Sequence, residues 1–223
     1  MTVTWSSPRQ GCLVVGLAIL AGAWLLAAAG YGMTGHMAAH MAAVAMAAPL
    51  LAFGLAGSRF DPAGRWPSLM APLTMSLVEM VVVWGWHLPA ARAAVAASAG
   101  VLALEQAMFV IAGLLLWSAC LGTLDAPGST RRAAGVAAML LTTMHMTLLG
   151  VLLALAPRIL FATSGFTCLG VSVGPLFDQQ LGGVVMLFVG GASYLAGGLH
   201  LLSRLLRPEA AQPWRVEDAG ARP

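Results

Sequence analysis

The sequence has no lysine and few charged residues of either sign. Only 9% of its 223 residues are charged, all eleven basic residues are arginines, and the formal net charge is +3. A nucleic-acid partner is therefore not expected, because such binding needs a dense basic patch. The chain is instead 60% hydrophobic and has a mean hydropathy of +0.87, which is typical of an integral membrane protein.

Common catalytic signatures are also missing. The sequence contains no HExxH zinc motif, no glycine-rich phosphate loop after a strand and no GxSxG nucleophile elbow. We therefore expect a protein that is not an enzyme.

Six apolar segments are each long enough to cross the hydrocarbon core of a bilayer, which takes about 20 residues. A backbone in lipid must satisfy its own hydrogen bonds, and these segments lack the alternation of a barrel, so we expect helices. We find no domain boundary and expect one all-α membrane bundle over residues 1–207 with a short polar tail at 208–223. The predicted spans are 11–30, 36–57, 68–88, 100–121, 133–156 and 181–203.

The arginines predict the orientation of the bundle. The N-terminus, the second and fourth connections and the C-terminus hold nine of them, whereas the other three connections hold only Arg92 and Arg158. By the positive-inside rule, both termini are expected in the cytoplasm. The first segment also resembles a signal peptide, but its apolar run is long, which favours a retained helix. The run LPAARAAVAAS after His87 is too short to span and is expected to lie along the outer interface.

Two histidines one helical turn apart stand among methionines in the stretch MTGHMAAHMAAVAM, residues 33–46. On a helix that advances 100° per residue, Met33, His36, Met37, His40 and Met41 lie within an arc of about 140°. Thioether sulfur suits Cu(I), and imidazole binds copper in either oxidation state. This helix face is therefore a candidate copper site.

Most other ionisable residues of the spans fall in the predicted outer half. His87 ends the third span, Glu105 lies about a turn and a half into the fourth, and Asp178 opens the sixth; Glu79 and His145 lie nearer the midplane. Ionisable groups are costly when they face lipid, so these are expected to face the interior. His87 is a candidate further ligand, and Glu105 or Asp178 could balance the charge of the metal.

Each of these residues also has a purely structural interpretation. Methionine is a common apolar filler, and membrane histidines serve as interhelical hydrogen-bond donors. His87 is close to two tryptophans and fits an interfacial aromatic belt, while Asp178, directly before an apolar run, fits a helix N-cap. Glu105 is harder to explain in this way, because an acidic residue below the surface needs a partner.

Several stretches together resemble the CtaG-like family of cytochrome c oxidase assembly factors, which are bacterial membrane proteins. The stretches are HMAAHMAAVAMAAPLLAFG (36–54), VVWGWHLPAARAA (82–94), LEQAMFVIAGLLLWS (104–118), HMTLLGVLLALAPRILF (145–161) and LFDQQLGGVVMLFVGGASYLAGGL (176–199). The resemblance implies a protein that helps to mature haem-copper oxidases by aiding the delivery of copper to the catalytic subunit. The resemblance also implies a functional role for the residues that match the family's motifs, namely His36, His40, His87, Glu105 and Asp178. Gln106 departs from the family pattern, which has a histidine there, so this position is not expected to bind metal strongly.

The favoured hypothesis is a copper-handling assembly factor in the bacterial inner (plasma) membrane. It would bind Cu(I) transiently at the outer mouth of the bundle and pass it to the catalytic subunit of a haem-copper oxidase, and a periplasmic protein could donate the metal. Three alternatives stay open: a copper permease or resistance protein, a haem-binding membrane electron carrier, and an assembly scaffold that binds no metal. The candidate metal-site residues are Met33, His36, Met37, His40, Met41, His87, Glu105 and Asp178.

Overall fold

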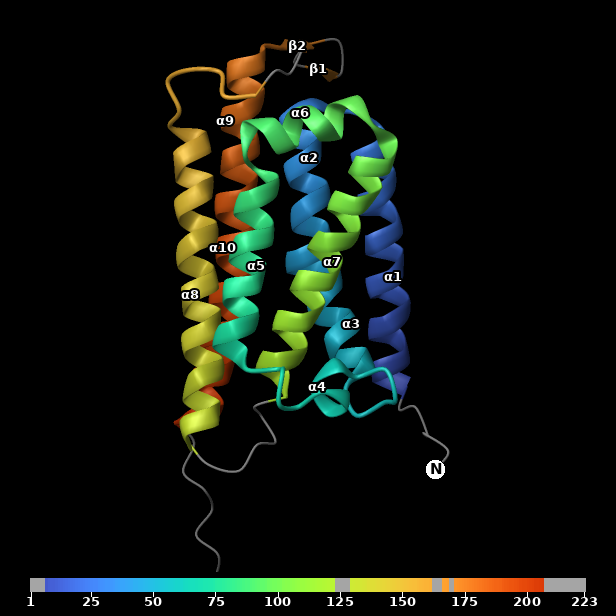
Figure 1. Cartoon of the computed structure of the whole chain (residues 1–223), viewed down its shortest axis with the longest axis vertical. Coiled ribbons are helices and arrows are strands. Elements are labelled where there is room, and N and C mark those ends of the chain that lie inside the picture. The colour runs from blue at the N-terminus through green and yellow to red at the C-terminus, as the bar shows by residue number, and fades with distance from the viewer. Residues whose placement is uncertain (1–6, 123–128, 162–165, 169–170, 207–223) are drawn as a thin grey trace, which may run out of the picture.

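The computed structural model describes residues 7–122, 129–161, 166–168 and 171–206. Within these residues the chain forms a bundle of long helices, with a short β-hairpin at one end (Figure 1). Five helices are long and apolar enough to cross a membrane, and a bent pair of helices brings the number to six. The prediction of an all-α bundle of about six spans is therefore confirmed, whereas the predicted tail at 208–223 lies outside the described residues.

The bounds of the helices agree with the predicted spans to within a few residues, except that the last one starts earlier than expected. The antiparallel hairpin of β1 and β2 was not predicted. In chain order the elements are α1 (Ser7–Ala28), α2 (Gly32–Met41), the π-helix η1 (Ala42–Ala47), α3 (Ala48–Leu55), α4 (Pro62–Arg65), α5 (Pro72–Trp86), α6 (Pro89–Ala97), α7 (Ala99–Leu121), α8 (Ser129–Ala154), β1 (Phe166–Cys168), β2 (Val171–Val173), α9 (Pro175–Val185), the π-helix η2 (Met186–Gly190) and α10 (Gly191–Leu205).

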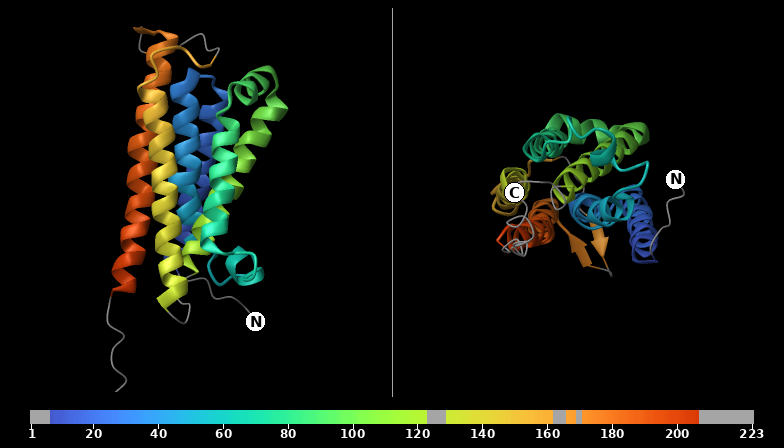
Figure 2. Two further views of the ribbon diagram at one scale, coloured as in Figure 1. Left: turned by 60° about the vertical axis from the view of Figure 1, so that its left-hand side comes forward. Right: turned by 90° about the horizontal axis from the view of Figure 1, so that it is seen from below.

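The helices run alternately up and down, so the first and last described residues lie at the same end of the bundle (Figure 1, Figure 2). We call this the termini end, and the opposite end, which carries α6 and the hairpin, the α6 end. The arginines divide unequally between the two. Arg92 and Arg158 belong to the α6 end, whereas the termini end holds Arg9, Arg59, Arg65, Arg131, Arg132 and Arg204. The cytoplasmic location of the termini end stays a prediction from this asymmetry.

The bent pair consists of α5 and α6, whose axes differ by 68°. The 15 residues of α5 span only about 22 Å at 1.5 Å per residue, which is short for a bilayer core. Pro89 is the first residue of α6, and Leu88 before it is extended, as expected for a residue that precedes proline. The bend lays α6 across the α6 end of the bundle (Figure 1), and it leaves His87 at the joint.

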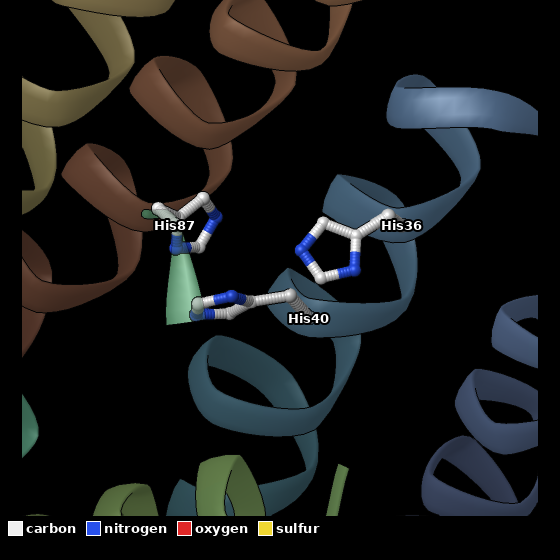
Figure 3. Close-up of side chains that lie close together, drawn as sticks. All are labelled: His36, His40 and His87. Atoms are coloured by element: carbon white, nitrogen blue, oxygen red, sulfur yellow. The ribbon is translucent and has the colours of Figure 1, made fainter. Parts of the chain in front are cut away.

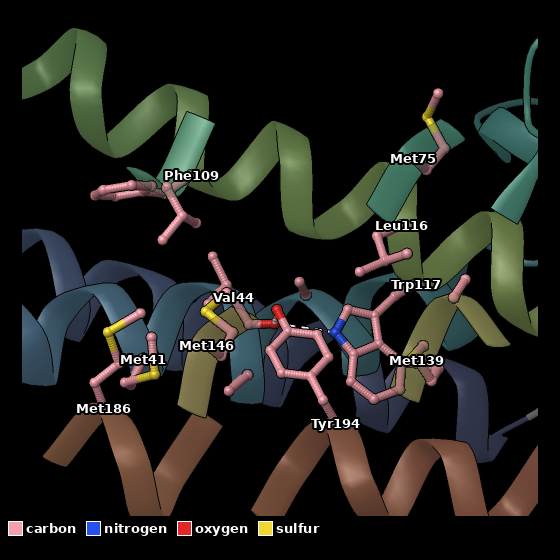
Figure 4. Packing of buried hydrophobic residues seen from close by; sticks show 14 of the residues in the cluster. Met41, Val44, Met75, Phe109, Leu116, Trp117, Met139, Met146, Met186 and Tyr194 are labelled. Carbon is pink, nitrogen blue, oxygen red and sulfur yellow. Dashed lines mark hydrogen bonds between the residues drawn. The ribbon is translucent and has the colours of Figure 1, made fainter. Parts of the chain in front are cut away.

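A π-helical turn in the second span provides polar contacts for the bundle centre. π-Turns leave carbonyl groups without their usual helical partners. In η1 the Val44 carbonyl accepts a hydrogen bond of 3.0 Å from Nε1 of Trp117 and lies 3.4 Å from the Tyr194 hydroxyl (Figure 4). The Ala45 carbonyl accepts a 2.7 Å hydrogen bond from Ser193. These bonds fix the second span against α7 and α10.

Small residues bring α8 and α9 into close contact. A Cβ atom added at Gly150 would lie 3.1 Å from the carbonyl oxygen of Gly183 on α9, and one at Gly183 would overlap the backbone of α8. Glycine thus allows the backbones to touch, which is a common way to pack helices in a membrane.

Candidate metal centre

Three buried histidines meet in the half of the bundle nearer the α6 end. His36 and His40 lie one turn apart on α2, and His87 follows the last turn of α5. One ring nitrogen from each lies within 4.8 Å of the other two (Figure 3). We call these residues the histidine triad. His36 and His40 come from the second predicted span and His87 from the third, and their role as metal ligands stays a prediction.

The ring nitrogens of the triad are largely without partners. Nδ1 of His87 pairs with the Val83 carbonyl at 2.6 Å, which assigns the proton to Nδ1 and leaves Nε2 as a lone-pair donor. Within the described residues, Nε2 of His36, both nitrogens of His40 and Nε2 of His87 make no hydrogen bond. Buried polar atoms are nearly always satisfied, and neutral imidazole is a common metal ligand. The triad therefore fits a small cation.

An aromatic ring closes one side of the triad. Phe109, on α7, packs against His40 with ring centroids 3.9 Å apart, and its centroid lies 6.1 Å from His36 and 6.2 Å from His87. Phe109 is fully buried. This apolar contact fixes the imidazoles and keeps water away from that side.

Glu105 connects the triad to α6. One of its carboxylate oxygens, Oε1, accepts a hydrogen bond from Nη1 of Arg92, and the other, Oε2, lies 3.7 Å from Nδ1 of His36. Glu105 is fully buried, and its expected need for a partner is met mainly by Arg92. Arg92 could not be selected from the sequence, because its partner Glu105 lies on the next helix.

Asp178 holds the start of α2 in place. Its two oxygens accept hydrogen bonds of 2.7 and 2.8 Å from the backbone amides of Met33 and Thr34. The residue is on α9, whose own N-cap is Gly174, so the capping interpretation was right in kind but named the wrong helix. Both oxygens are engaged, and Asp178 positions the helix that carries His36 and His40.

The methionines of α2 face another part of the bundle. A Cβ atom at Gly182 would lie 3.1 Å from Cγ of Met37, and one at Gly190 would lie 3.0 Å from Sδ of Met41. Both glycines belong to the last span, whereas the triad faces α5 and α7. Met33 is likewise buried in the hydrophobic core. The structure thus gathers three imidazoles, whereas Met37 packs against α9 and Met41 against η2. Their predicted role as ligands stays untested.

A second group of buried polar residues lies deeper in the bundle. The Tyr194 hydroxyl donates a hydrogen bond to Oε1 of Glu79, and the hydroxyls of Ser76 and Thr142 are 2.8 Å apart. His145 is also buried, and neither of its ring nitrogens has a partner among the described residues. It is not part of the triad.

Fold and site together define a class, namely helical membrane bundles with a buried three-histidine centre near one end. The family model described as cytochrome c oxidase caa3 assembly factor (Caa3_CtaG) matches residues 2–208. The chain belongs to this family, so the resemblance seen in the sequence is confirmed. Comparisons with curated proteins and with solved structures give no match. The family and the apolar helices make this a multi-pass membrane protein that acts in cytochrome c oxidase assembly.

Proposed function

We propose that this assembly factor carries copper, as Cu(I), on the histidine triad and aids its delivery to the catalytic subunit of a haem-copper oxidase. The proposal rests on one observation. Three buried imidazoles from two helices converge, and Nε2 of His36 and of His87 and both nitrogens of His40 have no partner in the described part of the chain.

The donor set suits copper. Imidazole binds copper in either oxidation state, and copper(II) is the most strongly held divalent ion of the first transition row. The Glu105 carboxylate, 3.7 Å from His36, can offset the charge of a cuprous ion. Three histidines also form known zinc sites, so the choice of metal has to be tested by direct competition.

The location of the triad suits delivery at a membrane surface. It lies near the α6 end, which the arginine distribution predicts to be the outer side. In the bacterial plasma membrane this side would face a periplasmic copper donor. Imidazoles are neutral ligands that bind metal only when deprotonated, and the buried Glu105 carboxylate stays paired with Arg92 when the ion leaves.

A copper permease is less consistent with the structure. At the termini end, a cavity between the helices is lined by Arg9 and Arg131, and guanidinium groups repel a departing cation. Loading and release on the same side therefore fit better than passage through the bundle.

The first test is copper stoichiometry. The protein is purified in detergent under reducing conditions, loaded with Cu(I) in the presence of a chromogenic chelator, and compared with a variant in which His36, His40 and His87 are replaced by alanine. His145→Ala is the matched control, since His145 is also buried with unpartnered nitrogens. We expect about one tightly held copper in the wild type and in His145→Ala, and none in the triad variant.

The second test is function in cells that make the oxidase. The triad variant is expected to leave the oxidase deficient in copper and inactive, whereas His145→Ala supports maturation. Full copper content in the oxidase of cells with the triad variant would point to a metal-free scaffold. A Soret band in the purified wild type would point to haem binding instead.

A further inference from the structure

The termini end of the bundle holds a cavity of about 280 Å³, at the opposite end from the triad. It lies between the start of α1, the segment from the end of α3 to α4, the end of α7 and the start of α8. A water molecule takes up about 30 Å³ in the liquid, so the cavity has room for a polyatomic ligand.

Three hydrogen-bond donors reach this cavity from three helices. Arg9 belongs to α1, Ser118 to α7 and Arg131 to α8. Arg9 donates one hydrogen bond of 2.9 Å to the Ala56 carbonyl, and the rest of its planar group of N–H donors can serve a ligand. Arg131 makes no ion pair or hydrogen bond with any residue that the structure describes.

Ser118 is the observation that points to a ligand. Its side chain is only 4% exposed, it lines the cavity, and its hydroxyl has no hydrogen-bond partner in the described part of the chain. A buried hydroxyl without a partner costs free energy unless something else satisfies it.

The net charge of the cavity is positive. Asp61 also lines it, but the two oxygens of this carboxylate already accept hydrogen bonds from the backbone amides of Gly57 (2.8 Å) and Ala63 (3.0 Å). The cavity is thus lined by two guanidinium groups and one carboxylate, and both oxygens of that carboxylate already accept backbone hydrogen bonds. A ligand here should be an anion.

We propose that this cavity binds a phosphate group through Arg9, Ser118 and Arg131. A phosphate offers three or more oxygens in a tetrahedral arrangement, which can meet donors from three directions, and arginine is suited to bind it bidentately. The group can come from the headgroup of an anionic phospholipid, which basic pockets at the cytoplasmic face attract, or from free phosphate. The site is independent of the copper proposal.

The test measures binding from both sources. Inorganic phosphate is titrated into the detergent-purified protein by calorimetry, and lipids retained from nanodiscs of phosphatidylcholine with or without phosphatidylglycerol are counted by native mass spectrometry. Arg131→Gln is the main variant, because Arg131 has no hydrogen bond or ion pair among the described residues that the substitution would break. We expect binding to weaken about tenfold or more, as for the loss of one charge-assisted contact. Ser118→Ala is expected to weaken it by a smaller factor.

Arg65→Gln is the matched control. Arg65 lies at the same end, but it stacks on Trp66, with 5.5 Å from its guanidinium carbon to the ring centroid, and does not line the cavity. The Arg65→Gln variant should therefore bind phosphate and phosphatidylglycerol as the wild type does. Retention of phosphatidylglycerol without binding of free phosphate would identify a lipid headgroup, and the reverse a soluble ligand. If neither is bound, or if Arg65→Gln weakens binding as much as Arg131→Gln, the proposal is wrong.

Discussion

Oε2 of Glu105 lies 3.7 Å from Nδ1 of His36, while Oε1 of the same carboxylate is held by Arg92. One buried acid therefore stands between a candidate metal ligand on α2 and a cation on α6. Groups that contact metal-binding histidines orient them and adjust their basicity. If the triad holds copper as proposed, this pair should influence how tightly it does so.

Replacing Glu105 should weaken copper binding without removing the site. We expect Glu105→Gln to lower the Cu(I) affinity by about 10- to 100-fold, the usual effect of losing such a partner of a metal ligand. Arg92→Gln should have the opposite effect, because it removes a positive charge that competes with the metal for Glu105. Chelator competition measures both affinities. If the two variants weaken binding equally, the pair only maintains the fold.

Asp178 should affect stability rather than copper binding. Asp178→Ala leaves the amides of Met33 and Thr34 without their acceptors, and the loss of such a cap costs up to about 2 kcal/mol. Asp178→Asn keeps one acceptor oxygen and should cost less. Reversible unfolding in mixed detergent micelles gives the free energies. Loss of copper from folded Asp178→Asn protein would show that Asp178 is a ligand after all.

The deep polar pair of Glu79 and Tyr194 should behave as one unit. Tyr194→Phe removes the hydroxyl that donates to Oε1 of Glu79, and leaving a buried acceptor unsatisfied costs about 1–3 kcal/mol. The double variant Glu79→Leu, Tyr194→Phe should then be less destabilised than the sum of its single variants. Additive losses in the unfolding free energy would contradict the pairing, and copper stoichiometry should not change in any of them.

The contact between α8 and α9 predicts a difference between two glycines. Gly183→Ala should destabilise the bundle by about 1–3 kcal/mol, because its Cβ would overlap the backbone of α8. Gly22→Ala, on α1, meets nothing within 4 Å and should be neutral or stabilising, since alanine favours helix. Thermal unfolding of the two variants checks this. Equal stability of both would mean that the helices can separate at no cost.

The fold could be predicted largely from the sequence because bilayer thickness fixes the length of each span. Local chemistry also predicted α6, since LPAARAAVAAS is short and weakly apolar. The π-turn η1 was not predictable, because the donors that its Val44 and Ala45 carbonyls accept from, Trp117 and Ser193, come from distant parts of the chain. The hairpin likewise has no strong local pattern in the sequence.

The site could be predicted only in part. Helical periodicity placed His36 and His40 together, and span ends placed His87 at a similar depth. The same periodicity put the methionines on one wide arc with the histidines, although the centres of the two sets differ by about 80°. An arc that wide contacts more than one neighbouring helix. Only the packing of the bundle shows that the methionine side of the arc faces the last span and the histidine side faces α5. Asp178 caps a helix 145 residues away, a contact that no local pattern reveals.

X-ray absorption at the copper edge of the Cu(I)-loaded protein tests the central claim most directly. The account predicts a first shell of nitrogen atoms with the outer-shell scattering of imidazole, lost when His36, His40 and His87 are replaced by alanine and retained in His145→Ala. A first shell of sulfur atoms, or the same spectrum from the triad variant, would contradict it.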